Sequence, residues 1–512
     1  MIQTSVEGSM ILLVGRILST FISAAGSIMV ARFLGSQKFG TMNIALIPIT
    51  FALLFVNNGS RSAMVRHIAE YKHANEPKKI QEIIVNGFAL NIIVGLIVSL
   101  IVFFCSGILA NQIFNLPEIA SVIRILSLSV IFQALVNISS GVLIGFEKMN
   151  QSVMLNILQS LARTVIGPTL IYLGLGITGA AYGYSIPFVI SGIFGVIFVY
   201  MNQRELRLSL SLFKVETFRT IIVYISPLFL SNIVSGGYNR LLEFVLSLNT
   251  TTVLIGNYSA ARSFGLLVSF FISPVSTATF PLLSKLNPKD QVFKKVYQNI
   301  IKYESLIVFP ITFTLIAFSQ HFVSILYGPT YTHTALYMQI YLLTFLFTGI
   351  GSSSNYVVLN SQKKTNIGFK ATVIIASIGI PLGIFLIPEY GVIGRLIIYI
   401  VAPIFGHLYV LIWLKNNYNV NPEYNNIAKI FISALIGFVF CKSFLFYSNI
   451  NPWVEIFIGG IIILVSYLVL ILLTGAITKE NLNEIQKIVI SYEMLYPILN
   501  PLFNALKRVA RE

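Results

Sequence analysis

Fourteen apolar stretches, each long enough to cross a bilayer, decide what this chain can fold into. A membrane-spanning helix needs about 20 mostly apolar residues. Only 10% of the 512 residues are charged, whereas a soluble domain carries about 25%. We therefore predict an all-α polytopic membrane protein with about 14 transmembrane helices. The predicted spans lie near 9–31, 40–60, 83–110, 119–144, 151–173, 178–201, 222–248, 253–283, 303–326, 335–359, 367–387, 392–414, 429–448 and 454–474.

The distribution of Lys and Arg predicts how the chain is oriented. Loops after even-numbered spans, together with the C-terminal tail, hold twenty-five of these residues, whereas loops after odd-numbered spans hold only Arg32 and Lys38. Basic loops stay on the cytoplasmic side of a membrane. Both termini are therefore predicted to be cytoplasmic, in a multi-pass protein of the cell membrane. The net charge of +16 then reflects membrane topology, and no nucleic-acid partner is expected.

Two pairs of segments align at one offset near 215 residues and indicate an internal duplication. Gly40 lies over Gly256, and Gly176 lies over Gly391. Parallel repeats of this kind are related by an axis along the membrane normal, and transporters built from them bind substrate between the halves. We predict two six-helix lobes around a central cavity. The predicted divisions are an N-lobe at 1–205 (spans 1–6), a C-lobe at 206–416 (spans 7–12), two further spans at 417–475, and a cytoplasmic amphipathic tail at 476–512.

Seven basic residues fall inside the predicted spans, and their depth separates them into two groups. Three lie toward span ends, where long side chains reach the headgroups, and we interpret them as structural: Arg124, Arg395 and Lys442. The other four lie near mid-span or about two turns from an edge. We predict that these four bind substrate in a cavity, with interhelical contacts that hold the bundle together as the alternative: Arg16, Arg163, Arg240 and Arg262.

Glu243 is the only acid deep inside the first twelve spans. Its i,i+3 spacing from Arg240 allows the two side chains to pair on one helix face. The pair is either a structural salt bridge or a switch that opens when substrate engages the arginine. Four arginines against one glutamate predict a cationic cavity, and the planar guanidinium fork suits phosphate oxygens. A pathway for cations would need unpaired carboxylates within the spans, and the sequence lacks them.

Two motifs carry a resemblance to a known family. Residues Ala31–Gly40 read ARFLGSQKFG and resemble the ARxLGxxxFG signature of Wzx-type polysaccharide flippases. Residues Leu326–Tyr331 read LYGPTY and are similar to the LxGxxY segment of the same proteins. The resemblance implies membership in the multidrug/oligosaccharidyl-lipid/polysaccharide exporter superfamily. It also implies transport of a polyprenyl-phosphate- or diphosphate-linked oligosaccharide from the cytoplasmic to the outer leaflet by alternating access.

Three other functions are weighed against this one. A peptidoglycan lipid-precursor flippase would share the fourteen spans and the cavity arginines. Cation-coupled multidrug efflux is disfavoured because intramembrane carboxylates are missing. A membrane glycosyltransferase or polymerase would need catalytic carboxylates or a large outer loop, so an enzyme is not expected.

The remaining expectations concern ligands and partners. Cys105 and Cys441 fall inside spans, which predicts neither a disulfide framework nor a metal site. His67, His73 and His333 are interpreted as solvated loop residues, and no cofactor is expected. The predicted partners are a lipid-linked saccharide and membrane lipids. Glycan polymerases or transferases are candidate protein partners, and the chain is expected to be a monomer.

Overall fold

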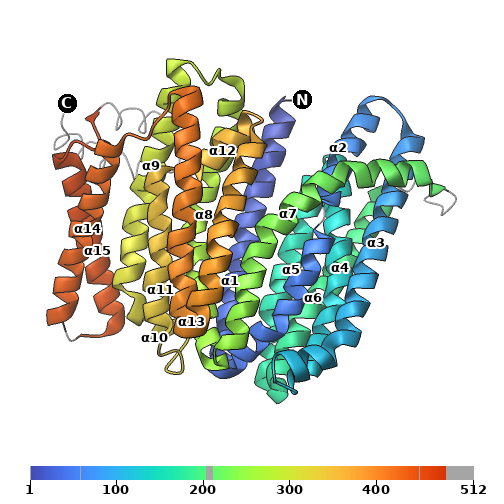
Figure 1. Ribbon diagram of the computed structural model, residues 1–512, viewed down its shortest axis with the longest axis horizontal. Helices are drawn as coiled ribbons and strands as arrows, with labels where there is room; N and C mark the ends of the chain where they lie inside the picture. The colour runs from blue at the N-terminus through green and yellow to red at the C-terminus, as the bar shows by residue number, and fades with distance from the viewer. Residues whose placement is uncertain (1, 58, 203–211, 449, 480–512) are drawn as a thin grey trace. The chain divides into compact units, whose positions relative to one another are not determined.

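The computed structural model describes residues 2–57, 59–202, 212–448 and 450–479 (Figure 1). Every long element in these ranges is a helix, and the described residues form no strand. The predicted all-α polytopic class is confirmed. The tail predicted at 476–512 lies, from residue 480 onward, outside the described residues.

The described helices account for about fourteen crossings. Nine helical runs among the described residues are long and apolar enough to span a membrane, and a tenth is a pair of helices bent by 47° between 334 and 361. Three of the nine runs are 54 or 63 residues long and each contains two predicted spans, because one crossing takes about 20 residues. These three runs are Ile11–His73, Met149–Asn202 and Thr365–Tyr418. Helix α8 (Thr252–Lys285) covers predicted span 8.

The double-length runs break at glycines whose backbone conformation other residues rarely adopt. Helix α1 (Ile2–Val56) breaks at Gly35, with φ 71°. Helix α13 (Thr365–Tyr418) breaks at Gly391, with φ 54° and ψ −125°. Gly176, which begins α6 (Gly176–Asn202), has φ 53° and ψ −127°. Only glycine populates this region readily, and the matching angles at two aligned positions support the internal duplication.

The chain divides into two compact units. The first unit comprises Met1–Leu266, Ser324–Tyr337 and Thr372–Ala402. Within it, α4 packs against α3 and α6, and α5 packs against α1 and α6. The core of this unit is largely aliphatic, and small buried polar side chains such as Ser140 and Ser152 lie between its helices. Its further helices are α2 (Ser60–His73), α3 (Pro77–Ile108), η1 (Leu109–Ile113), α4 (Ile119–Gly145), α5 (Met149–Leu170), η2 (Ile171–Leu175) and α7 (Val215–Asn249).

The second unit comprises Leu267–Val323, Met338–Ala371 and Pro403–Glu512. Its core is more aromatic, with Phe293 and Tyr297 fully buried where α9 packs against α14. The helices that lie in it, or that it shares with the first unit, are α9 (Gln291–Ala317), α10 (Ser319–Leu326), α11 (Thr334–Leu342), η4 (Leu343–Ile350), α12 (Ser354–Ser361), α14 (Tyr424–Tyr447) and α15 (Pro452–Leu473).

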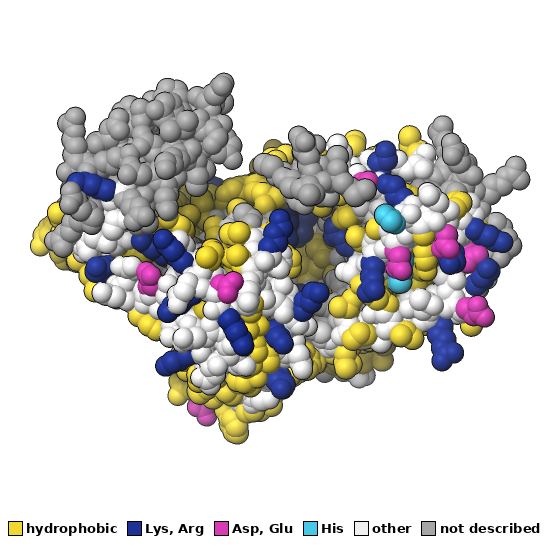
Figure 2. All heavy atoms as spheres, turned by 90° about the horizontal axis from the view of Figure 1, so that it is seen from above, with side chains coloured by type: hydrophobic (Ala, Val, Ile, Leu, Met, Phe, Trp, Pro, Cys, Tyr) yellow, Lys and Arg dark blue, Asp and Glu magenta, His cyan; other side chains and the backbone are white. Residues whose placement is uncertain are grey.

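Residues 61–82, taken as a loop from the sequence, are mostly helical. Helix α2 and the first turns of α3 occupy them, and Pro77 at the first position of α3 suits a helix start. The exposed charges of this segment gather at the right of Figure 2. The prediction that His67 is a solvated loop residue is wrong, since it is 9% exposed and its ring stacks on Tyr71. A search for apolar stretches overlooks a short helix with charges on one face.

Candidate functional site

Two cavities in the first unit are lined by the four arginines that the sequence analysis predicted to bind substrate. The larger has a volume of about 700 Å³ and is lined by α1, α2, α5 and α8. Its cations are Arg16, Arg61 and Arg163, and the rest of its lining is polar but uncharged or aliphatic. No Asp or Glu is among the described residues that line it, so we call it the acid-free cavity.

Close packing of α1 on α5 positions Arg16 and Arg163 in this cavity. The hydroxyls of Ser23 and Ser160 lie 2.9 Å apart across the two helices. Such hydroxyl contacts allow the helices to approach closely without a polar group left unsatisfied. Arg163 is half-buried, and its guanidinium carbon lies 4.9 Å from the centroid of the Tyr184 ring. This cation–π contact holds the charge in the cavity without neutralising it.

Arg61 is the cation that the sequence analysis missed, because it was counted with the basic residues of a loop. It is the second residue of α2. Gly59, the residue before α2, has φ 92°, a left-handed conformation that glycine adopts readily. Arg61, in the first turn of α2, lines the cavity wall. The only feature of the sequence that could have indicated this position is the pair Gly59 and Arg61 at the end of predicted span 2.

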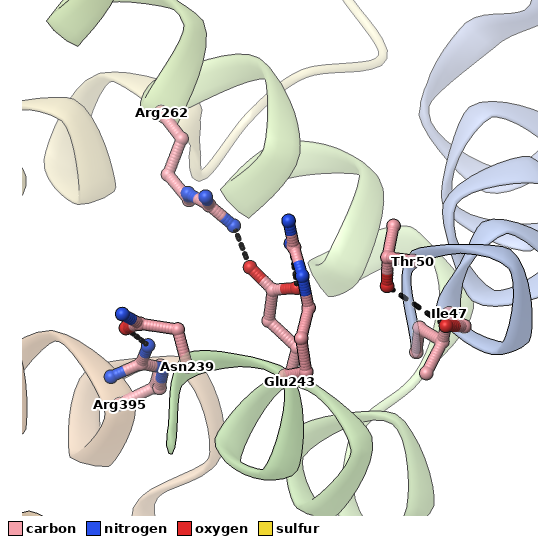
Figure 3. Close-up of polar contacts among 7 residues, drawn as sticks. Ile47, Thr50, Asn239, Glu243, Arg262 and Arg395 are labelled. Carbon is pink, nitrogen blue, oxygen red and sulfur yellow. Dashed lines mark hydrogen bonds and ion pairs between the residues drawn. The ribbon is translucent and has the colours of Figure 1, made fainter. Parts of the chain in front are cut away.

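The smaller cavity has a volume of about 160 Å³ and is lined by α1, α7 and α8. Its charged residues are Arg240, Glu243 and Arg262, so we call it the Glu243 cavity. Arg240 Nη1 lies 3.1 Å from Glu243 Oε2, as the i,i+3 spacing predicted. Arg262 Nη1 donates to the other carboxylate oxygen of Glu243 (Figure 3). The Glu243 side chain is 12% exposed, so both guanidinium groups are paired with one sheltered carboxylate.

A third cavity of about 70 Å³ lies between these two along the first unit. It shares Ser27 and Arg163 with the acid-free cavity. It shares Asn43 and Leu46 with the Glu243 cavity. The shared lining residues place the three cavities in series, with the smallest in the middle.

Arg395 contradicts the expectation that it reaches the membrane surface. Its side chain is 0% exposed, Nη2 donates to Asn239 Oδ1 at 3.0 Å, and its guanidinium carbon lies 3.8 Å from the Tyr399 ring centroid (Figure 3). The break at Gly391 starts a new helical segment that turns Arg395 toward α7, and span boundaries alone carry no information on that rotation. Arg124, by contrast, is exposed as predicted and donates to Ser106.

The sequence analysis also overlooked a buried acid. Glu304, at the edge of predicted span 9, is 1% exposed, and the Ser354 hydroxyl donates to its carboxylate at 2.5 Å in the second unit. Glu243 is therefore not the only acid buried within the first twelve spans. In the described part of the chain, no three His, Cys, Asp or Glu side chains are grouped as a metal site would require.

The two family motifs contact each other in the first unit. Arg32 Nη1 donates to the Ile325 carbonyl at 2.5 Å, and the Tyr331 hydroxyl donates to the Ala31 carbonyl at 2.6 Å. Arg32 thereby satisfies a carbonyl at the C-terminal end of α10, where helix carbonyls lack intrahelical partners. The motifs are separated by about 300 residues in sequence, and their contact gives both a common structural role.

Gly40 and Gly256, which align in the predicted repeats, allow α1 and α8 to cross closely. A Cβ atom on Gly40 would lie 1.7 Å from the Thr252 carbonyl oxygen, and one on Gly256 would lie 2.0 Å from that of Ser36. Only glycine permits this approach. The contact is reciprocal, as expected for equivalent residues beside a pseudo-two-fold axis.

These features define a multi-pass helical membrane protein of the transporter class, built on an internal repeat around arginine-lined cavities. Residues 29–336, more than half of the chain, match the family model described as Polysaccharide biosynthesis protein. The chain belongs to this family. The resemblance to Wzx-type flippases, noted from the two motifs, is confirmed.

Relatives agree with the assignment, and a solved structure has a similar fold. The chain is 22% identical over 371 residues to the probable low-salt glycan biosynthesis flippase Agl15 of Haloferax volcanii, covering 71% of this chain and 76% of Agl15. It is 20% identical to the lipopolysaccharide biosynthesis protein WzxC of Escherichia coli, covering 80% and 82%. The fold is similar to that of the lipid II flippase MurJ in an inward closed conformation, with TM-score 0.75, 21% identity, and 90% and 98% of the two chains covered.

Proposed function

We propose that this chain is a flippase that moves a polyprenyl-(di)phosphate-linked oligosaccharide from the cytoplasmic to the outer leaflet by alternating access. The acid-free cavity is the observation that carries the proposal, because Arg16, Arg61 and Arg163 face about 700 Å³ with no carboxylate among its described lining residues. Relatives named as a glycan biosynthesis flippase and a lipopolysaccharide biosynthesis protein support it. Such a cavity can separate a charged headgroup on a lipid chain from the bilayer, and a polyprenyl carrier is what the resemblance to Wzx-type flippases implies.

The chemistry of the acid-free cavity favours a phosphate headgroup. Guanidinium groups make paired, charge-assisted hydrogen bonds to phosphate oxygens. The uncharged polar side chains beside them, among them Asn156 and Gln159, offer donors and acceptors to sugar hydroxyls. Cavities of about 300–1,000 Å³ bury most of a small ligand. The prenyl chain would stay in the lipid.

The order of the cavities supplies a route across the membrane. Arg61 begins α2, on the side that the loop charges assign to the cytoplasm. Helix α7 ends at Asn249, on the side that the loop charges assign to the exterior. Glu243 lies six residues before that end, which is about 9 Å at 1.5 Å per residue. The headgroup would enter the acid-free cavity, pass Arg163, and reach Arg240 and Arg262 when Glu243 releases them. Movement of the predicted lobes at 1–205 and 206–416 would open each side in turn.

The remaining predictions fit this role. Both termini would face the cytoplasm of the cell membrane, and the protein would act as a monomer. A glycan polymerase or transferase on the outer side would consume the flipped product and drive net flow.

Flipping in proteoliposomes tests the proposal. A prenyl-diphosphate oligosaccharide is loaded, and its exposure to an added glycosidase is timed for wild type, for Arg163→Ala with Arg240→Ala, and for Arg124→Ala as the control. Protein-dependent exposure that the double variant loses and the control keeps is the expected result. A parallel assay uses a peptidoglycan lipid precursor, and transport of that substrate alone would replace the proposed substrate. No exposure of either substrate by folded wild type would overturn the proposal.

A further inference from the structure

Arg395 carries a buried charge that the established family role does not explain. Nη2 is satisfied by Asn239, but Nε and Nη1 have no hydrogen-bond partner among the described residues. Tyr399 lies against its face, and Tyr238 and Tyr258 lie near enough to interact with its charge. A buried charge without an opposite charge is costly, and ionisable residues inside the membrane usually mark function.

The position of Arg395 relative to Glu243 follows from helix geometry. Asn239 and Glu243 are four residues apart on α7, so their side chains lie one turn apart on one face. Because Asn239 accepts a hydrogen bond from Arg395, that guanidinium lies about one turn from the Glu243 carboxylate (Figure 3). The two charges are close enough to interact. One carboxylate therefore stands among three guanidinium groups and pairs with two of them.

We propose that Arg395 is a positioning residue, an alternative partner that receives the Glu243 carboxylate when an anionic headgroup occupies Arg240 and Arg262. This role rests on the proposed function. A phosphate at Arg240 and Arg262 repels the Glu243 carboxylate, which needs another cation in a low-dielectric site. Nε and Nη1 of Arg395 are the donors that can receive it, because guanidinium and carboxylate favour a paired geometry.

The proposal defines two states with different affinities for the anion. In the state described here Glu243 occupies Arg240 and Arg262, and in the other state it pairs with Arg395 and leaves them open. When only one state binds a ligand, the apparent affinity is reduced by the fraction of molecules in that state. A change that weakens the Glu243–Arg395 pair should therefore weaken anion binding, although Arg395 never contacts the anion.

Binding of farnesyl diphosphate to the Glu243 cavity of the purified full chain in detergent tests the role. Calorimetry resolves it from binding in the acid-free cavity, farnesol is the control for partitioning, and each Kd is that of the Glu243 cavity. Arg395→Met keeps the side-chain volume and should raise the Kd about tenfold. In a Glu243→Gln chain the same substitution should change the Kd by less than about twofold, because no carboxylate needs a second partner. Arg395→Lys, which keeps the charge, should restore most of the affinity. Arg124→Met is the matched control and should bind as wild type.

Asn239→Ala gives a prediction of opposite sign and does not depend on how well Arg395→Met folds. It frees Arg395 from its neutral partner, shifts Glu243 toward Arg395, and should lower the Kd about threefold. Weaker binding by Asn239→Ala, or an equal loss from Arg395→Met with and without Glu243, would overturn the role and make Arg395 structural. In those cases the wild type still binds farnesyl diphosphate, so only the role of Arg395 fails. If the wild type does not bind it at all, the anion site itself fails and this role fails with it.

Discussion

The acid-free cavity and the Glu243 cavity contain the same kind of cation in opposite electrostatic settings. In the larger cavity three arginines face about 700 Å³ without a carboxylate among its described lining. In the smaller cavity two arginines share Glu243 within about 160 Å³. An anion can bind in the first cavity directly. In the second it must displace Glu243 from the two arginines. Along the proposed route the anion therefore meets one site that is open to it and one that an ion pair already occupies.

Neutralising cations in the acid-free cavity should have the largest effect on transport. Arg16→Gln with Arg163→Gln removes two hydrogen-bonding charges, each worth about 1.5–3 kcal/mol in such contacts. We expect the flipping rate at low substrate concentration to fall about 100-fold or more. The measurement is headgroup exposure in proteoliposomes.

Arg124→Gln is the matched control for this pair, since Arg124 is an exposed intramembrane arginine outside all three cavities. It should leave the rate within about twofold of wild type. If the control lowers the rate as much as the double variant does, the cavity charges are not what the headgroup requires.

We expect the close crossing of α1 and α8 to keep the Glu243 cavity small. In Gly40→Ala the new methyl would meet the Thr252 carbonyl and push the helices apart, at a cost of about 2 kcal/mol or about 30-fold in population. We expect Ser259→Cys, in the wall of that cavity, to react about 30-fold faster with a water-soluble thiol reagent. The assay uses a chain with Cys105 and Cys441 replaced by alanine.

Gly237→Ala provides the comparison for that substitution, because nothing lies within 4 Å of where its Cβ would be. It should leave the reaction rate of the reporter cysteine unchanged. An unchanged rate in folded Gly40→Ala as well would show that something other than this crossing limits access to the Glu243 cavity.

Removing the acid should make the second cavity resemble the first. Glu243→Gln frees Arg240 and Arg262, so we expect farnesyl diphosphate to bind about tenfold more tightly, while flipping slows because the headgroup is released less readily. Calorimetry gives the affinity, and the proteoliposome assay gives the rate. Weaker binding would indicate that Glu243 orients the arginines rather than competing with the anion.

The sequence predicted the class, the repeat and the Arg240–Glu243 contact because each leaves a local pattern. Apolar length defines a span, and the alignment of Gly176 with Gly391 anticipated two breaks with nearly the same angles. The Arg240–Glu243 contact followed from its spacing alone. Each of these predictions depends only on the pattern within one helix or on one repeat offset.

The sequence could not predict features that depend on how helices rotate and cross. Arg395 looked like a residue near a span end, yet the break at Gly391 turns it inward to Asn239. Arg61 was counted among the basic residues of a loop, yet it lies in the first turn of α2 and lines the acid-free cavity. Separation of the four predicted arginines into two cavities likewise depends on contacts between distant segments, which a single sequence does not encode locally.

The smallest effect should come from removing the hydrogen bond between the hydroxyls of Ser263 and Tyr327, which lie 2.5 Å apart. Ser263 lies in the wall of the acid-free cavity. Tyr327→Phe removes that hydrogen bond and should lower the free energy of unfolding by about 1 kcal/mol, without changing farnesyl diphosphate affinity in either cavity.

Its pH dependence sharpens this test. Burial raises the pKa of Tyr327 to about 12, above the ordinary value of about 10. The unfolded chain therefore ionises first, so the stabilisation by Tyr327 is constant below about pH 10 and is lost as the pH rises toward 12. Thermal unfolding of wild type and variant at pH 7, 9 and 10.5 should show a difference that is equal at the first two values and smaller at the third. A difference that already shrinks between pH 7 and 9 would mean that this hydroxyl is exposed to solvent and does not hold the cavity wall.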